Sequence, residues 1–210
     1  MKVKPFTCMV GKSLLIISLA LILQASQTPK VILFFGDSLT AGYGLSTTEA
    51  FPSLIEKRLN GNGKSVKVIN AGLSGETSAG GLARIDWVLR QPIDVFVLEL
   101  GANDGLRGLP IEQTQKNLEG IIGRVRAKYP KVKIVIAGMM VPPNMGPDYS
   151  EKFRQIFPAI AKKHDATLIP FLLEDVAGEE RLNLSDGIHP NVEGHKVVAK
   201  NVFRIIEPLI

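Results

Sequence analysis

The sequence predicts an α/β fold in which a parallel sheet forms the middle layer between two layers of helices. From Val31 onward, short apolar runs alternate with longer segments of helical periodicity, as expected of successive β-α-β units. Several of these runs are almost continuously apolar, which is typical of strands that helices cover on both faces. With 210 residues, of which 45% are hydrophobic, the chain is long enough to bury one full core.

Each expected element follows from its local pattern. The strands are short runs rich in Val, Ile, Leu and Phe, and the sequence places them at Val31–Phe35, Val66–Asn70, Val95–Leu100, Lys133–Met139 and Thr167–Ile169. Longer stretches with helical spacing, some of them ended by proline, predict helices near Ala50–Leu59, Ser78–Leu89, Ile111–Lys128, Asp148–His164 and Asn191–Ile206. No internal repeat or linker interrupts them, so residues 29–210 are predicted to form a single domain.

The first 25 residues have the pattern of a secretory signal peptide. Lys2, Lys4 and Lys12 precede an apolar run from Ser13 to Leu23, and Ala25 offers a small residue for cleavage. This run of 11 residues is shorter than the roughly 18 expected of a spanning helix. We therefore expect an exported protein, periplasmic or secreted, with no stable membrane span in the mature chain; an uncleaved membrane anchor is the less favoured alternative.

Charge and cysteine content exclude several functions for the mature chain. Loss of the three N-terminal lysines lowers the formal charge from +5 to +2, and no stripe of Lys and Arg mixed with aromatic residues follows, so no nucleic-acid partner is expected. Cys8 is the only cysteine and precedes the apolar run. A mature chain without it has no disulfide, no thiol nucleophile and no cysteine-ligated metal.

Ser38 comes directly after the first predicted strand, within Gly36-Asp37-Ser38-Leu39. It therefore lies at the carboxyl edge of the sheet, where open α/β sheets bind ligands. A serine or aspartate in this place often does no more than cap the following helix. Taken alone, the motif favours the cap.

Asp186 and His189 lie three residues apart in Asp-Gly-Ile-His-Pro. A histidine base can activate a serine hydroxyl, and a carboxylate can hold the second nitrogen of the imidazole. The alternative is a helix cap beside an incidental histidine. The chain has only three histidines; His164 is expected at a helix end, where its charge would suit the helix dipole, and His195 falls inside the last helix. His189 is therefore the candidate base.

Two further loops offer donors for the oxygen that becomes negative during acyl transfer. Gly75 follows the second strand with an unobstructed backbone N–H, and Asn103 follows the third with a side-chain amide. Each also has a plainer interpretation, as a turn glycine and as a side chain that ties down its own loop. All of these elements are nevertheless expected at one edge of the same sheet. A chance arrangement is a poor explanation for this clustering.

Together these motifs resemble the SGNH, or GDSL, hydrolase family from Val31 to the C-terminus. Ser38, Gly75 and Asn103 match the blocks of the nucleophile and the oxyanion hole, and Asp186 with His189 in D-x-x-H-P matches the rest of the catalytic triad. The resemblance implies a three-layer α/β/α sandwich with flavodoxin-like strand order 2-1-3-4-5. It also implies an oxyanion hole formed by the N–H groups of Ser38 and Gly75 and by the Asn103 amide, with no metal or organic cofactor.

Two segments, Gly105-Leu106-Arg107-Gly108-Leu109 and Pro170-Phe171-Leu172-Leu173, resemble the bacterial periplasmic thioesterases, lysophospholipases and arylesterases of this family. The resemblance implies that the partner is a small-molecule acyl ester or thioester. An acyl groove is predicted from apolar residues near the catalytic motifs: Leu73, Leu106, Leu109, Met140, Pro142 and Ile188. Several of them would equally suit core or loop packing. A carbohydrate acetyl esterase and a catalytically silent binding module on the same fold are the alternative functions, and the oligomeric state is left open.

Overall fold

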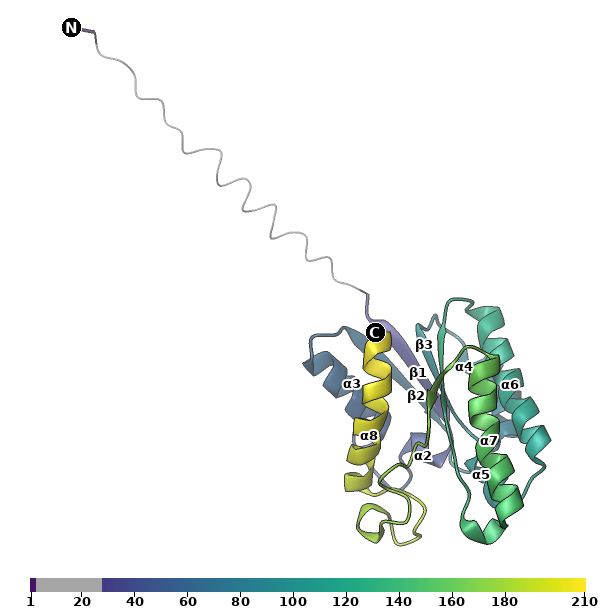
Figure 1. The fold of residues 1–210 in the computed structure, drawn as a ribbon. Coiled ribbons are helices and arrows are strands. Elements are labelled where there is room, and N and C mark those ends of the chain that lie inside the picture. The colour runs from purple at the N-terminus through teal and green to yellow at the C-terminus, as the bar shows by residue number, and fades with distance from the viewer. Residues whose placement is uncertain (3–27) are drawn as a thin grey trace.

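The computed structural model of the protein describes Met1, Lys2 and residues 28–210. The rest of the predicted signal peptide therefore lies outside the described residues. The strands form one five-stranded parallel sheet in the order β2-β1-β3-β4-β5, which confirms the predicted topology (Figure 1). Their bounds are β1 Lys30–Gly36, β2 Val66–Gly72, β3 Val95–Glu99, β4 Lys133–Ala137 and β5 Thr167–Ile169.

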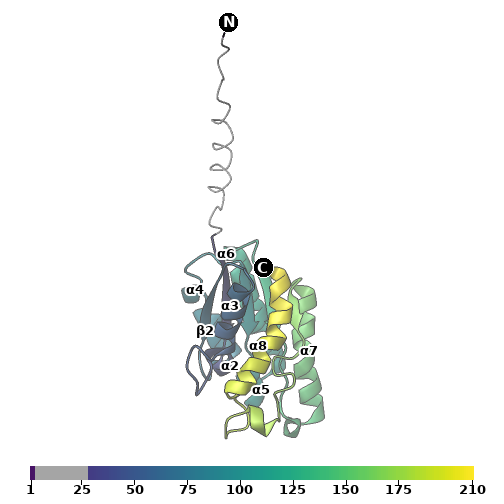
Figure 2. The ribbon, with the colours of Figure 1, turned by 90° about the vertical axis from the view of Figure 1, so that its left-hand side faces the viewer.

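Helices cover both faces of this sheet. On one face lie α3 (Phe51–Gly61) and α8 (Val192–Ile206), and on the other lie α4 (Ser78–Val88), α6 (Ile111–Lys128) and α7 (Pro147–Lys163), as Figures 1 and 2 show. The remaining helical segments are short: α2 Ser38–Ala41, α5 Ala102–Leu106 and the 3₁₀ turns Pro143–Met145, Glu180–Leu182 and Glu207–Leu209. None of the described helices is both long and apolar enough to cross a membrane.

The burial pattern explains why these residues form these layers. All five residues of β3 are buried, because helices cover both of its faces. In α8, buried residues recur every three or four positions, as in Val198, Val202 and Ile206, so that one face of the helix packs on the sheet. In the edge strand β2 only Val66 is buried, and the residues that follow it are partly buried or exposed.

The helices α2 and α5 are absent from the sequence prediction. They contain four and five residues, too few for a hydrophobic period to show. Both begin within three residues of a strand end, β1 for α2 and β3 for α5. They are therefore the segments that turn the chain away from the sheet at its carboxyl edge.

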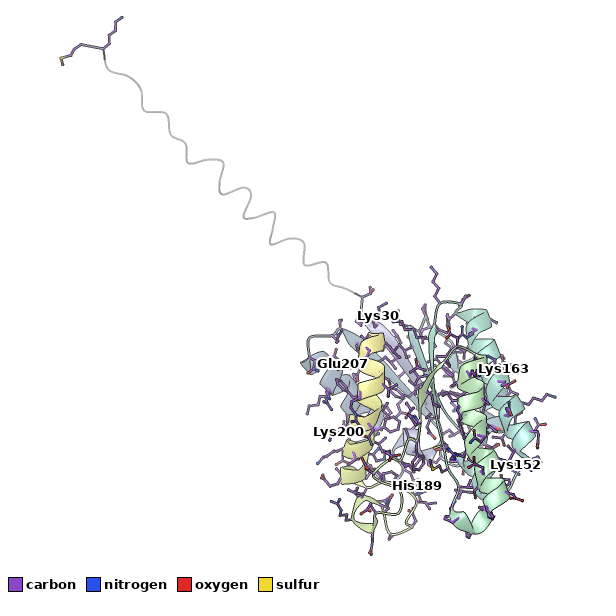
Figure 3. All side chains as sticks on the ribbon, in the orientation of Figure 1. Lys30, Lys152, Lys163, His189, Lys200 and Glu207 are labelled. Carbon is purple, nitrogen blue, oxygen red and sulfur yellow. The ribbon has the colours of Figure 1, made fainter. Side chains whose placement is uncertain are left out.

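The register of the sheet brings the carboxyl ends of three strands to one level. Gly36, the last residue of β1, pairs with Gly72 of β2 on one side and with Glu99 of β3 on the other. The loops that carry Ser38, Gly75 and Asn103 therefore leave the sheet side by side. Figure 3 shows Lys30, at the start of β1, and His189 at opposite ends of the molecule, so the site lies far from the point where the described body of the chain begins.

Gly36 allows two neighbouring side chains to occupy the space beside β1. A Cβ atom at this position would lie 2.2 Å from Thr40 Oγ1 and 2.3 Å from Glu99 Oε2, well inside van der Waals contact. Glu99 also approaches through its backbone oxygen, at 2.6 Å. The glycine is thus a steric requirement of the turn that leads to Ser38.

We predict that Gly36→Ala lowers the free energy of unfolding by about 1–3 kcal/mol, because the added methyl group overpacks a buried site. Urea denaturation of the protein measures this change. Gly123→Ala is the matched control, since a methyl group added there, on the exposed face of α6, would meet nothing within 4 Å. That change should stabilise the helix by about 0.5–1 kcal/mol; equal effects of the two substitutions would contradict the steric argument.

Candidate active site

The sequence left open whether Ser38 caps a helix, and the structure shows that Asp37 provides this cap. The Asp37 side chain caps α2 by accepting a hydrogen bond from the Leu39 N–H at 3.0 Å. The Ser38 side chain is therefore not needed as a cap, and its Oγ lies 2.9 Å from Nε2 of His189. Ser38 is buried apart from 8% of its surface, so its hydroxyl is held in one direction while still facing a cavity.

Asp186 and His189 form a tight local turn. One oxygen of Asp186 accepts the backbone N–H groups of Ile188 and His189, each at 3.0 Å, and the other lies 2.7 Å from His189 Nδ1. Gly187 makes the turn with a φ of 73°, a conformation that favours glycine. The His189 N–H, the Ile188 N–H and then the imidazole lower the pKa of Asp186 to about 2. Asp186 is therefore a carboxylate at neutral pH.

Tyr43 lies against the imidazole of His189, with ring centroids 4.5 Å apart and planes inclined by 36°. It is half exposed, so it covers one side of the imidazole and limits the access of water. The sequence prediction missed this residue. Its position five residues after Ser38, on the same loop, was the only available signal.

The other two histidines lie elsewhere. His195 is buried in α8, its Nδ1 accepts the Phe51 N–H at 3.1 Å, and burial lowers its pKa to about 4, in agreement with the structural position expected for it. His164 caps the C-terminal end of α7, the helix-end position expected for it, but its Nε2 is buried without a partner among the described residues. Burial lowers the pKa of His164, which disfavours the positive charge that would suit the helix dipole.

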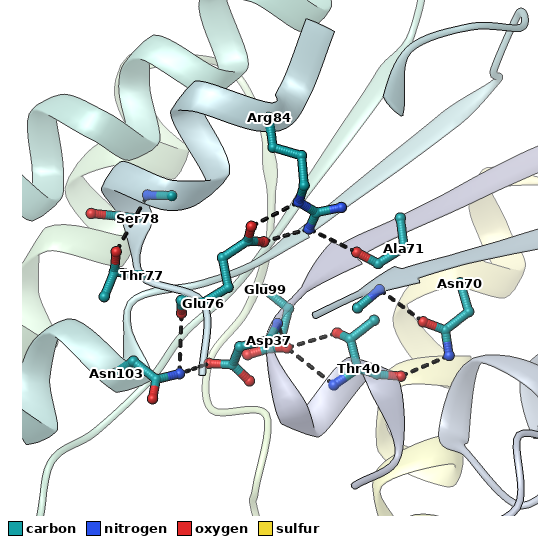
Figure 4. Close-up of polar contacts among 12 residues, drawn as sticks. Asp37, Thr40, Asn70, Ala71, Glu76, Thr77, Ser78, Arg84, Glu99 and Asn103 are labelled. Atoms are coloured by element: carbon teal, nitrogen blue, oxygen red, sulfur yellow. Dashed lines mark hydrogen bonds and ion pairs between the residues drawn. The ribbon is translucent and has the colours of Figure 1, made fainter. Parts of the chain in front are cut away.

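The three expected oxyanion donors differ in what they already bind. The backbone N–H groups of Ser38 and Gly75 donate to no other described residue, and both residues line the cavity. The Asn103 side-chain amide nitrogen instead donates to Asp37 Oδ2 and to the Glu76 carbonyl oxygen, both at 3.1 Å (Figure 4). Asn103 therefore also ties loops together, which was the alternative interpretation of this residue.

An ion pair fixes the loop that carries Gly75. Glu76 is buried, and both of its carboxylate oxygens accept from the guanidinium of Arg84 in α4, with Nε to Oε1 at 2.7 Å (Figure 4). Arg84 also donates to the Ala71 carbonyl oxygen at 3.0 Å and lies 4.4 Å from the centroid of the Phe35 ring. This pair joins α4, the end of β2 and the core.

A second buried carboxylate holds the loop of Asn103. Asp104 accepts hydrogen bonds from the Ser78 backbone N–H at 2.8 Å and from the Ser78 hydroxyl at 2.5 Å. The Thr114 hydroxyl donates to it as well, at 3.3 Å. The start of α5 is thereby tied to the starts of α4 and α6, so the Asn103 backbone has little freedom to move.

A cavity of about 760 Å³ opens beside Ser38 and His189. Four of the six residues predicted to bind substrate line it: Leu106, Met140, Pro142 and Ile188. Leu73, although exposed, and Leu109 are not among its lining residues. The sequence prediction omitted lining residues from the loop after β5, among them Phe171, Leu173 and Ala177.

Among the described residues, no group of three or more His, Cys, Asp or Glu side chains has an arrangement that would hold a metal ion.

The fold and this site define a hydrolytic enzyme in which a serine-histidine-aspartate arrangement lies at the carboxyl end of a five-stranded parallel sheet. The chain belongs to the GDSL-like lipase/acylhydrolase family, whose model matches residues 34–197. It is accordingly an ester or thioester hydrolase with small-molecule acyl substrates.

Individual relatives agree with this assignment. The chain is 39% identical to the esterase TesA of Pseudomonas aeruginosa over 91% of its own length and 96% of that protein. It is 36% identical to thioesterase 1/protease 1/lysophospholipase L1 of Escherichia coli K12, over 91% of its length and 90% of that protein. A crystal structure of TesA matches with a TM-score of 0.82 and 39% identity, covering 86% of this chain and all of the other.

We predict that Arg84→Met lowers the free energy of unfolding by about 3–5 kcal/mol, because it leaves the buried Glu76 carboxylate without its partner. Denaturant unfolding tests this value. Arg154→Met is the control: its pair with Glu151 is exposed, and such pairs contribute about 0–1 kcal/mol. A loss below 1 kcal/mol for Arg84→Met would show that the pair does not hold the loop.

Proposed function

We propose that the protein hydrolyses its substrates through an acyl-enzyme, with Ser38 as the nucleophile, His189 as the general base and Asp186 as the group that orients His189. The observation that supports this mechanism is the unbroken chain of contacts from Asp186 Oδ2 through the imidazole to Ser38 Oγ. As Ser38 attacks the acyl carbon, His189 takes the hydroxyl proton and Asp186 stabilises the imidazolium. His189 then protonates the leaving group as its bond to the acyl carbon breaks. Water next attacks the acyl-enzyme while His189 takes its proton, and His189 returns that proton to Ser38 Oγ as the acid is released.

The N–H groups of Ser38 and Gly75 are the primary oxyanion donors in this proposal. Neither has another acceptor among the described residues, so both are available when the carbonyl oxygen becomes negative. The Asn103 amide contributes as the third donor only if it shares one N–H between the oxyanion and its present acceptor, Asp37 or the Glu76 carbonyl. This arrangement makes Asn103 a donor whose position depends on its neighbours.

Ser38→Ala is expected to abolish turnover of p-nitrophenyl esters and covalent labelling by a fluorophosphonate, because no other hydroxyl in the described part of the chain contacts His189 Nε2. Turnover rate and labelled mass measure the two effects. Ser74→Ala is the matched control, since Ser74 lines the same cavity without contacting His189, and it should keep both properties. Near wild-type turnover by Ser38→Ala would refute the mechanism, and a wild-type protein that never labels would support the silent binding module instead.

The cavity supports an acyl chain as the group that is bound. Its lining is mostly apolar and includes Leu106, Met140, Val141 and Leu173 beside the serine. Burial of each methylene group in such a site contributes about 0.8 kcal/mol. We therefore propose medium-length or longer acyl esters and thioesters as substrates, in preference to the acetyl groups of a carbohydrate esterase.

A series of p-nitrophenyl esters from acetate to octanoate tests this preference. We expect kcat/KM to rise by about two- to fourfold per methylene until the cavity is filled. Met140→Ser should reduce this gradient because Met140 lines the cavity, whereas Leu73→Ser should not, although Leu73 is similarly exposed. A steady fall in kcat/KM from acetate to octanoate would exclude an acyl groove and favour the acetyl esterase.

We also propose that residues 1–25 direct export to the periplasm or outside the cell, and that residues 29–210 act as one catalytic domain. The basic and apolar pattern of the N-terminal segment supports the first statement. The single described sheet, with its helices on both faces, supports the second.

A further inference from the structure

Two carboxyl groups lie buried beneath Ser38 with no cation paired to either of them. Asp37 and Glu99 are both 0% exposed, and no ion pair of the described residues includes either side chain. Figure 4 shows the end of the Glu99 side chain beside Asp37. Two adjacent carboxylates in a protein interior repel each other and lose their hydration, so both are not expected to be ionised.

The hydrogen bonds of the four carboxyl oxygens are unequal. The Asp37 oxygens accept from the Leu39 N–H at 3.0 Å and from the Asn103 amide at 3.1 Å. Glu99 Oε2 accepts from the Asp37 N–H at 3.1 Å, the Thr40 N–H at 3.2 Å and the Thr40 hydroxyl at 2.7 Å. Glu99 Oε1 is buried and has no donor among the described residues.

An oxygen buried without a donor is unfavourable as an acceptor, but a proton on that oxygen makes it a donor. Asp37 is the adjacent group whose carboxylate accepts hydrogen bonds; its backbone N–H lies 3.1 Å from Glu99 Oε2, and the two side chains lie next to each other in Figure 4. We propose that Glu99 is a neutral carboxylic acid whose Oε1–H donates to the Asp37 carboxylate, and that Glu99 thereby positions Asn103 through Asp37. The catalytic part of this inference rests on the proposed role of Asn103 as an oxyanion donor.

The pKa shifts of the two carboxyl groups also place the proton on Glu99. Burial raises the pKa of Glu99 well above its usual range, and the nearby Asp37 charge raises it further. Burial also raises the pKa of Asp37, but hydrogen bonds from Leu39, Asn103 and Glu99, together with the charge of His189, limit that rise to about 6. Glu99 is therefore the group that keeps its proton at neutral pH.

The location of the proton determines which way Asn103 is held. An ionised Asp37 accepts from the Asn103 amide nitrogen and fixes that nitrogen at the edge of the cavity. If Asp37 carried the proton instead of Glu99, its hydroxyl group could face the Asn103 amide N–H. Both groups are donors, so the hydrogen bond between Asn103 and Asp37 would be lost. Glu99 is thus a positioning residue that acts through two others and does not touch the substrate.

Glu99→Gln is the decisive substitution, because glutamine reproduces the neutral acid. Its amide nitrogen can donate to Asp37 while its oxygen accepts from Asp37 N–H and Thr40. We expect kcat within about threefold of wild type and an unchanged midpoint of urea unfolding. Asp104→Asn is the matched control at a buried carboxylate that only accepts, and it should lower the unfolding midpoint. A loss of 100-fold or more in kcat for Glu99→Gln would show that Glu99 acts as an anion, and would overturn the proposal.

Glu99→Leu tests the positioning role, because leucine cannot donate to Asp37. We expect kcat to fall at least tenfold with KM nearly unchanged, since an oxyanion donor acts mainly in the transition state. In an Asn103→Ala background the same substitution should have little further effect. Equal loss of kcat in both backgrounds, or no loss in either, would exclude positioning through Asn103.

Infrared spectroscopy of the wild-type protein at neutral pH gives a readout that needs neither activity nor the leucine variant. The C=O stretch of a protonated carboxyl group should be present, and Glu99→Gln should remove it. Absence of this band from the wild type would refute a neutral Glu99. The band does not depend on the acyl-enzyme mechanism, which Ser38→Ala tests, so failure of either proposal is recognised separately.

Discussion

The site depends on the register of β1 between its two neighbours. Gly36 lies opposite both Gly72 and Glu99, so three strands end at one level and their loops converge without a long connection. This alignment is compatible only with a residue that lacks a side chain at position 36, because Thr40 and Glu99 fill the space beside it. Parallel strands between helical layers therefore supply the site with a rigid floor, and the loops above it supply the chemistry.

Buried polar contacts between loops hold the side of the site where the proposed oxyanion donors lie. A continuous path runs from Arg84 through Glu76, Asn103 and Asp37 to Glu99, and thus from α4 across two loops to β3. Networks of this kind hold a single arrangement when every member is satisfied, and they are costly when one is not. The Asp186–His189 turn, in contrast, is organised mainly by its own backbone N–H groups.

The cavity combines this rigid polar wall with apolar side chains from loops distant in the sequence. Leu106 follows β3, Met140 follows β4 and Leu173 follows β5, so no single segment forms the proposed acyl-binding surface. Tyr43 closes the side next to the imidazole. Substrate preference in such a site depends on several short loops, whereas the positions of Ser38, Gly75 and Asn103 depend on the ends of three strands. The two can therefore change independently.

The amino-acid sequence by itself determined the strand and helix pattern and the local spacing of Asp186 and His189, because these depend on periodicity and on contacts within a few residues. It also supplied the residues that match the family blocks. Only the tertiary structure decided that Glu99, which looks like an interruption in an apolar strand, meets Asp37, and that Leu73 and Leu109 lie outside the cavity lining. Those outcomes depend on strand register and on the direction of each side chain, which arise from packing between segments far apart in the chain.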